Sequence, residues 1–414
     1  MKCLIVFSIG IVCLLITYLF KKTLYNASGI FVLMWSVCLG LSCLGLYGLN
    51  KPSNEVIYLG CLSMLIFTFT GILKTKLIIF DKKRIKNSTF LKYDPLTDNS
   101  KLFLFHIIAY IFSFPYLLKA IKIIKNVGIY ALRNVAFTNS EYASTSVLII
   151  FQTIIAPLFV ATMLLTMIDI SRGFFFKKSI FLTFVDVILY TILFGGRYMF
   201  FQLLIFLIFV MYDGYGGRLI YFINKHKKIV LFSLIIVLIM IFITQSRSKR
   251  AFLESAYVYY CGSFSYLSYL IDNKIGTDLY LLGKTQIGFV YNFCFLIISF
   301  LTNIDYKGSN HIVTQLTQFT VSIGDGISYN SLGTILHDFI TDYGIYGSLF
   351  GIFLFGIACK YFEDAKNNTG RSFYYASNIY FLYSTVNSVL SYTFRGPGTL
   401  MLFIYLFMFC KGKK

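Results

Sequence analysis

The chain has 414 residues, of which 57% are hydrophobic and 13% charged, and its mean hydropathy is +0.75. Soluble domains carry about 25% charged residues, and apolar runs of about 18 residues or more match a hydrocarbon layer of about 30 Å. The composition excludes a soluble enzyme, a disordered chain and a secreted disulfide scaffold. The net charge of +20 comes from 37 Lys and Arg against 17 Asp and Glu. Most basic residues lie in short tracts between apolar runs, which indicates topology signals and argues against a nucleic-acid partner.

Apolar windows in chain order predict an all-α, polytopic helical membrane protein with about 11 transmembrane helices. The first window carries no A-x-A-like cleavage site and is interpreted as a retained span rather than a signal peptide. A further window, 287–301, is short and contains Asn292, and we expect it to dip into the membrane or lie on its surface. The predicted spans are 3–20, 30–48, 56–73, 102–119, 147–168, 179–194, 198–212, 229–245, 343–360, 373–390 and 398–410.

The distribution of basic residues predicts the orientation of these spans. With the amino end outside and the Lys-rich tail inside, the inner side carries 23 of the 37 basic residues. If 287–301 also spanned, either the basic inner loops or the tail would face outward. We therefore predict three regions: an N-terminal bundle of about 8 spans (1–245), one large periplasmic loop (246–342) and a C-terminal bundle of about 3 spans (343–414).

Four arginines lie on the predicted outer side, which the positive-inside rule should deplete. Arg197 follows two glycines in a tight turn, Arg247 and Arg250 open the long loop, and Arg395 lies beside glycines in the last outer turn. A single arginine at a span end has two balanced interpretations, binding an anion or reaching lipid headgroups. All four together favour an anionic ligand, because the guanidinium group binds phosphate through two parallel hydrogen bonds. We expect them to converge on one outward-facing cavity.

The long loop offers further candidate residues. Tyr257 opens a tyrosine-rich stretch that suits either stacking on sugar rings or an interfacial aromatic belt. Glu254 is a candidate base or an internal partner for an arginine. At the end of the loop, a helix would place Asp338 and Asp342 on one face, and Asp338 or His337 could accept a proton from a hydroxyl group. A capping and packing role is equally open for this segment, and Asp342 is the more plausible cap or arginine partner.

Metal and cofactor signals are missing from the sequence. The nine cysteines are scattered without a CxxC or Cys/His spacing, and the outer face has no DxD-like pair, so we predict neither a metal nor a cofactor. Asp186 lies in the middle of the span 179–194, where a charge is costly. A proton-coupled transporter would use such a residue, and it could instead pair with an arginine or stay protonated.

Three short motifs resemble those of bacterial oligosaccharide repeat-unit polymerases, the O-antigen and capsule polymerases. They are GGR at 195–197, R-x-x-R at 247–250 and D-x-G-x-x-G at 342–347, in a layout like that of C-type membrane glycosyltransferases. The resemblance implies a multi-pass protein of the bacterial inner membrane, with an active site that faces the periplasm. It also implies transfer of the growing glycan from undecaprenyl pyrophosphate onto a new lipid-linked repeat unit, with a chain-length regulator and a flippase as partners besides membrane lipid.

This resemblance assigns roles to the candidate residues and leaves alternatives. The candidate catalytic residues are Arg197, Arg250, Asp338 and His337. The candidate substrate-binding residues are Arg247, Arg395, Tyr257, Glu254 and Asp342. Related O-antigen ligases carry a histidine before the glycine motif, but Gly333 stands at that position here and His337 is out of register. A lipid-linked oligosaccharide flippase or another transporter is the alternative from a different class.

Overall fold

A computed structural model describes residues 1–73, 100–138, 144–214, 251–302, 307–329 and 332–410, with a few single residues between these ranges. Helices dominate the described residues, and the strands are only two residues long each. The prediction of an all-α chain is confirmed at this level. Five helices in the described part of the chain are long and apolar enough to cross a membrane: Lys2–Lys21, Asn54–Ile72, Ser100–Asn126, Ser146–Ser171 and Thr334–Thr369. Eleven crossings stay a prediction.

A helix occupies each predicted span within the described residues, while most of the predicted span 229–245 lies outside them. The helix ends follow local sequence signals. The Asn26 side chain accepts a hydrogen bond from the Gly29 amide (2.9 Å) and so begins the second helix. The helices concerned are α1 (Lys2–Lys21), α2 (Ala27–Ser42), α3 (Asn54–Ile72), α4 (Ser100–Thr138), α6 (Ala156–Ser171), α7 (Lys177–Phe194), α8 (Tyr198–Gly214), α14 (Thr334–Thr369), α15 (Ser372–Asn387) and α16 (Gly398–Phe409).

The chain divides into two compact units. The first contains Met1–Arg84, Ala251–Thr369 and Tyr380–Thr399, and the second contains Ile85–Arg250, Gly370–Ile379 and Leu400–Lys414. These units group segments by contact rather than by membrane topology, so the predicted boundaries at 245 and 342 stay predictions.

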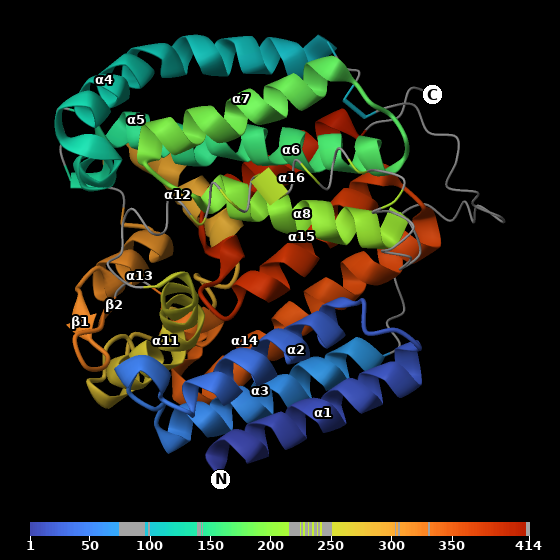
Figure 1. Ribbon diagram of the computed structural model, residues 1–414, viewed down its shortest axis with the longest axis vertical. Helices are drawn as coiled ribbons and strands as arrows, with labels where there is room; N and C mark the ends of the chain where they lie inside the picture. The colour runs from blue at the N-terminus through green and yellow to red at the C-terminus, as the bar shows by residue number, and fades with distance from the viewer. Residues whose placement is uncertain are drawn as a thin grey trace. The chain divides into compact units, whose positions relative to one another are not determined.

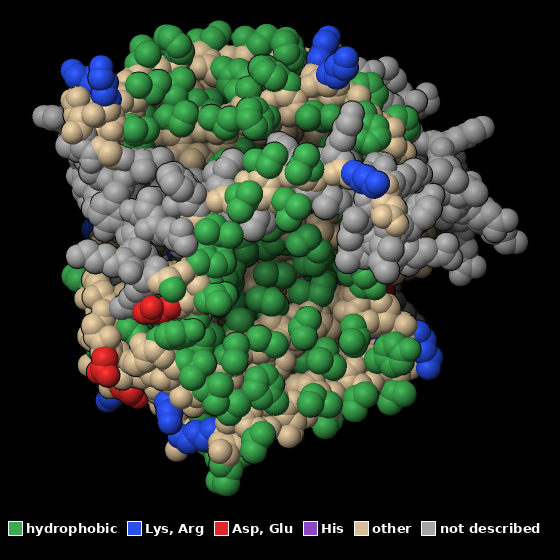
Figure 2. Space-filling model, viewed as in Figure 1, with side chains coloured by type: hydrophobic (Ala, Val, Ile, Leu, Met, Phe, Trp, Pro, Cys, Tyr) green, Lys and Arg blue, Asp and Glu red, His purple; other side chains and the backbone are tan. Residues whose placement is uncertain are grey.

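In the first unit, α1, α2, α3 and α14 pack side by side (Figure 1). Small residues allow the close approach: a Cβ on Gly10 would lie 2.4 Å from the Ser36 Cβ, and one on Gly356 would lie 2.2 Å from the Thr70 Oγ1. Such contacts are typical of helix packing in membranes, where small residues let two backbones meet. Figure 2 shows hydrophobic side chains covering much of the described surface on one face, with Lys and Arg mainly at its margins.

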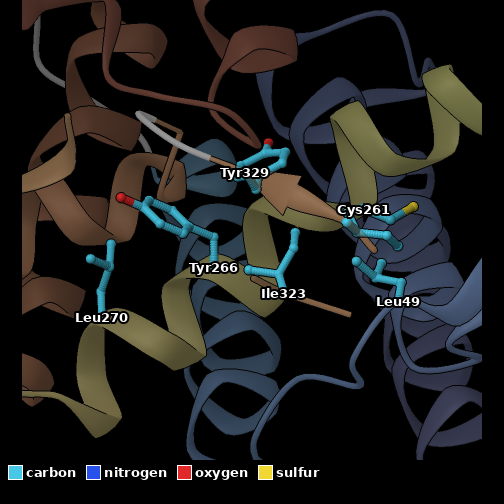
Figure 3. Packing of buried hydrophobic residues seen from close by; sticks show 7 residues of the cluster. Leu49, Cys261, Tyr266, Leu270, Ile323 and Tyr329 are labelled. Atoms are coloured by element: carbon cyan, nitrogen blue, oxygen red, sulfur yellow. The ribbon is translucent and has the colours of Figure 1, made fainter. Parts of the chain in front are cut away.

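A small layer of loop and helix lies beside these helices in the first unit. It consists of α11 (Phe252–Asp272), α13 (Ser309–Thr317) and a hairpin of β1 (Val321–Ser322) and β2 (Ser328–Tyr329). The hairpin and α11 enclose a buried cluster together with the turn after α2 (Figure 3). The cluster comprises Leu49, Cys261, Tyr266, Leu270, Ile323, Ile327 and Tyr329.

The second unit is built on α4, α6, α7 and α8, with α7 in contact with the other three. A short helix, α5 (Thr145–Ile150), joins α6 through a π-helical turn, η2 (Phe151–Ile155). Pro157 follows this turn and lacks the amide hydrogen that the regular ladder needs, which accounts for the locally widened helix. The helical path of α4 breaks at Gly128, whose φ is 84°.

Candidate functional site

The first unit contains a buried polar network at the start of α14. This helix begins at Thr334, before the predicted span at 343, so the segment that carries the predicted acids is helical. Its first two amide groups donate to a turn after α15: Thr334 N to Leu390 O (3.0 Å) and Ile335 N to Ser388 O (2.8 Å). The backbone groups at the start of the helix thus hold it against the last predicted outer turn.

Asp338 binds that turn through both carboxylate oxygens. The Arg395 Nη1 donates to Oδ1 at 2.7 Å, and the Tyr392 amide donates to Oδ2 at 2.9 Å. The Asp338 side chain is 2% exposed and the Arg395 side chain 21% exposed. The carboxylate is therefore sequestered, whereas the Arg395 side chain is partly exposed and its Nη1 is held by Asp338. A charge-assisted hydrogen bond of this kind is roughly twice as strong as a neutral one.

Asp342 binds backbone amides of a loop. It is fully buried and accepts hydrogen bonds from the amides of Thr285 (3.0 Å) and Gln286 (2.8 Å). The partner of Arg395 is Asp338, one helical turn earlier. Asp342 therefore orders the loop that precedes α12 (Gly288–Thr302).

A glycine allows this loop to contact α14. The helix breaks at Gly344 (φ 77°, ψ 176°), in a backbone region that residues with a Cβ rarely adopt. The carbonyls of Thr341 and Asp342 accept hydrogen bonds from Leu281 (2.9 Å) and Leu282 (3.0 Å) of the loop. The glycine of the D-x-G-x-x-G motif is therefore required by the backbone geometry of this junction.

Gln286 links the two carboxylate sites. Its carbonyl accepts a hydrogen bond from the Tyr392 hydroxyl (2.9 Å), and its side chain bonds to the Tyr343 hydroxyl (2.8 Å) and the Gly351 carbonyl (3.0 Å). Burial raises the pKa of Tyr392 well above its ordinary value, so this hydroxyl stays a neutral donor. The Arg395 turn, the loop and α14 thus form one hydrogen-bonded assembly.

Asn292 of α12 bonds to the backbone of Arg395. Its Nδ2 donates to the Arg395 carbonyl at 2.8 Å and to the Ser309 Oγ at 3.0 Å, and the side chain is fully buried. The start of α12 lies against the same residue, because a Cβ on Gly288 would be 2.5 Å from the Arg395 carbonyl oxygen. Arg395 is therefore held through both its side chain and its backbone.

Three further predicted site residues belong to the first unit. His337 is 2% exposed, and its Nε2 lies 3.3 Å from the Ile275 carbonyl oxygen. The Tyr257 hydroxyl on α11 donates to the Leu41 carbonyl at the end of α2 and accepts from the Leu46 amide in the turn that follows, and burial raises the pKa of Tyr257 to about 12. Glu254 lies in the first turn of the same helix. The contacts of Tyr257 favour a structural role over stacking on a sugar.

The remaining predicted arginines are not part of the first unit as described. Arg197 belongs to the second unit, where it follows Gly195, a left-handed residue (φ 58°) that ends α7. Arg247 and Arg250 lie outside the described residues. The predicted convergence of the four arginines stays a prediction.

A second buried polar cluster lies within the second unit, around Asp186. The carboxylate contacts the His106 Nε2 (3.0 Å) and accepts a hydrogen bond from the Tyr110 hydroxyl (2.7 Å); both His106 and Asp186 are 1% exposed or less. The His106 Nδ1 lies 2.8 Å from the Leu102 carbonyl oxygen. When the His106 Nδ1 carries a proton and donates it to that carbonyl, the contact between Nε2 and the Asp186 oxygen needs a further proton, either on Nε2 or on the carboxyl group. Asp186 thus has a histidine partner rather than an arginine.

Sequence reasoning gave too little weight to the amide and tyrosine side chains of the first unit. Tyr392 and Gln286 carried no signal, whereas Asn292 stood out as a polar residue in an apolar window. His106 carried little signal because only the fold brings it to Asp186. Among the described residues, no group of three or more His, Cys, Asp and Glu side chains could hold a metal ion.

No protein-family model, curated protein or solved structure matches the chain. The resemblance to repeat-unit polymerases therefore depends on the motifs of the sequence.

Proposed function

We propose that this protein is a membrane glycosyltransferase that polymerises oligosaccharide repeat units carried on undecaprenyl pyrophosphate. The observation that carries the proposal is Arg395, an arginine whose guanidinium group is held by a buried carboxylate and whose side chain is partly exposed. A preorganised cation of this kind can stabilise a phosphate leaving group without rearranging during the reaction. The long apolar helices supply the membrane setting that a lipid-linked substrate requires.

The proposed reaction needs little besides positioning and charge stabilisation. The acceptor hydroxyl oxygen attacks the anomeric carbon of the growing glycan, and the bond between that carbon and the diphosphate oxygen breaks. The electron pair leaves with undecaprenyl pyrophosphate, where Arg395 binds the developing negative charge, and the hydroxyl proton passes to a base or to water. Diphosphate is already a good leaving group, so neither a nucleotide sugar nor a metal is required by this proposal.

Within this proposal, Asp338 is a positioning residue for Arg395. Both of its oxygens already accept hydrogen bonds and the side chain is 2% exposed, which favours a positioning role over direct contact with a substrate hydroxyl. A general base must approach the proton that it removes to within about 2.6–3.2 Å. The roles of Asp338 and His337 as bases, and those of Arg197, Arg247 and Arg250 in diphosphate binding, stay predictions that mutagenesis must test.

The proposed topology has eleven spans in the bacterial inner membrane, with the amino end and the loop 246–342 in the periplasm. It rests on the distribution of basic residues and on the apolar helices. Under this topology Arg395 lies on the periplasmic side, where the family's substrates are polymerised.

Deletion of the gene followed by gel sizing of the surface glycan tests the proposed activity. A polymerase mutant should carry single repeat units on the surface, because flipping and attachment continue without polymerisation. Complementation with the wild-type gene should restore long chains, and Arg395→Lys should restore them poorly because lysine lacks the planar fork. Loss of all surface glycan would contradict the proposal and indicate flipping or ligation.

One observation favours a second function, a proton-coupled flippase. The pair His106–Asp186 is buried on two of the helices that occupy predicted spans, and its two titratable side chains lie 3.0 Å apart, as those of a proton-coupling site would. The variant Asp186→Asn separates the two functions. A flippase should lose surface glycan, whereas a polymerase present at normal protein level should keep its chain-length distribution.

A further inference from the structure

Helix α12 is largely apolar, and few of its residues are buried. Only Gly288 and Asn292 are buried in it, whereas Ile298, Phe300 and Leu301 are 51%, 82% and 73% exposed. Its sequence contains no Asp, Glu, Lys or Arg. Exposing so many large apolar side chains to water is unfavourable at about 25 cal/mol per Å², so this surface requires a hydrocarbon partner.

The buried start of α12 lies directly on Arg395. Gly288 allows the helix to meet the Arg395 backbone, and Asn292 donates to the Arg395 carbonyl at 2.8 Å. The Phe289 ring contacts Phe394, the neighbour of Arg395, at a centroid distance of 6.1 Å. The start of α12 therefore lies against the backbone of Arg395.

A second cation lies at the same end of the helix. Lys284 precedes α12 and is exposed, and its Nζ is 5.8 Å from the centroid of the Tyr291 ring on the first turns of the helix. The Lys284 carbonyl accepts a hydrogen bond from Ser309, which is also bonded to Asn292. Two basic residues thus lie at the polar end of an apolar helix about 22 Å long.

We propose that α12 binds the polyprenyl chain of an anionic lipid whose diphosphate group lies at Arg395 and Lys284. The arrangement matches this class of ligand because a polyprenyl diphosphate also joins two negative groups to one end of a long hydrocarbon chain. The choice of a diphosphate rests on the proposed function. Bulk phospholipid is the competing occupant, and it carries one phosphate and shorter chains.

Photo-crosslinking tests this binding mode without depending on turnover. The full-length protein carries Phe300→p-benzoylphenylalanine on α12 or, as the matched control, Phe20→p-benzoylphenylalanine on α1, where the native side chain is 67% exposed. Each variant is placed in phosphatidylcholine nanodiscs with radiolabelled undecaprenyl diphosphate. We expect about tenfold more labelling at Phe300 than at Phe20, the ratio given by a preference of about 1.4 kcal/mol.

Competition and a charge variant identify the occupant. Excess unlabelled undecaprenyl diphosphate should remove the label at Phe300, and the same excess of phosphatidylglycerol should not. Lys284→Gln, which replaces an exposed side chain, should lower the labelling severalfold without changing the expression level. Equal labelling at both positions, or equal competition by phosphatidylglycerol, would show that α12 contacts only bulk lipid. A repeat with Ile298→p-benzoylphenylalanine guards against a local defect at Phe300.

Failure of the inference is distinguishable from failure of the proposed function. Specific labelling of α12 in a protein that makes no polymer would leave the lipid site intact and overturn the polymerase. Polymer formation from purified lipid-linked repeat units without specific labelling at Phe300 or Ile298 would keep the polymerase and overturn the lipid site.

Discussion

The pair Asp338–Arg395 permits a double-mutant test of the difference between a positioning residue and a general base. Arg395→Gln leaves a carboxylate that is 2% exposed with only the Tyr392 amide as a donor. Breaking a buried ion pair in this way costs about 3–5 kcal/mol, and we expect about 3 kcal/mol because Arg395 is 21% exposed. Asp338→Asn removes the charge-assisted bond and places an amide NH₂ group against one of the two donors. We expect this change to lower the free energy of unfolding by about 2–3 kcal/mol.

The double variant Asp338→Asn with Arg395→Gln should be more stable than Arg395→Gln alone. Two neutral amides can bond to each other, and no buried charge is left without a partner. We expect a coupling energy of about 1–3 kcal/mol, measured from urea unfolding of the detergent-solubilised protein. Free-energy changes that add to within about 0.5 kcal/mol would show that the two side chains do not interact, and would refute the reasoning.

Turnover of purified lipid-linked repeat units separates the two roles. If Asp338 positions Arg395, Asp338→Asn should raise KM for the lipid donor, retain much of kcat and leave the shape of the pH–rate profile unchanged. If Asp338 is the base, kcat should fall by about 10²–10⁴ and the acidic limb of the profile should disappear. The second result would reverse our assignment, and an equal assay of His337→Ala and Glu254→Gln would show whether another base exists.

Three further predictions concern the neighbouring structure and the topology. Asn292→Ala should destabilise the protein by about 1–3 kcal/mol and lower the polymerisation rate, because the Arg395 carbonyl loses its donor. The control Gln315→Ala, on the exposed face of α13, should change neither quantity in the same assays. Gly344→Ala should cost about 1–3 kcal/mol in urea unfolding, because φ of 77° with ψ of 176° is strained for a residue with a Cβ; an unchanged midpoint would mean that the break in α14 is absent. In a background free of native cysteines, Lys274→Cys should react with an impermeant maleimide from the periplasm and Asn367→Cys should not, and the reverse pattern would overturn the proposed topology.

Composition and apolar windows were sufficient to predict the helices of the predicted spans, but not α11 and α13, which lie in the predicted loop 246–342. Long apolar runs specify helical segments because every backbone group must be satisfied within the segment when no water is present. For that reason, a helix was found at each predicted span that the structure describes. The limits of the elements were less predictable: α14 starts at Thr334 because its first amides bond to a turn more than fifty residues away, and no local signal encodes those partners.

The sequence also singled out the charged residues of the site, but their partners depend on the tertiary structure. Asp338, Asp342 and Arg395 were recognisable because charges are rare in so apolar a chain. Which carboxylate meets Arg395 was not predictable, because Asp338 and Asp342 share one helix face and differ only in what packs against each turn. In the folded protein, Arg395 donates to Asp338 and the loop amides donate to Asp342. Likewise, the partners of Asn292 and His106 became known only from long-range packing, since the hydrogen bonds of buried polar groups depend on the folded neighbourhood.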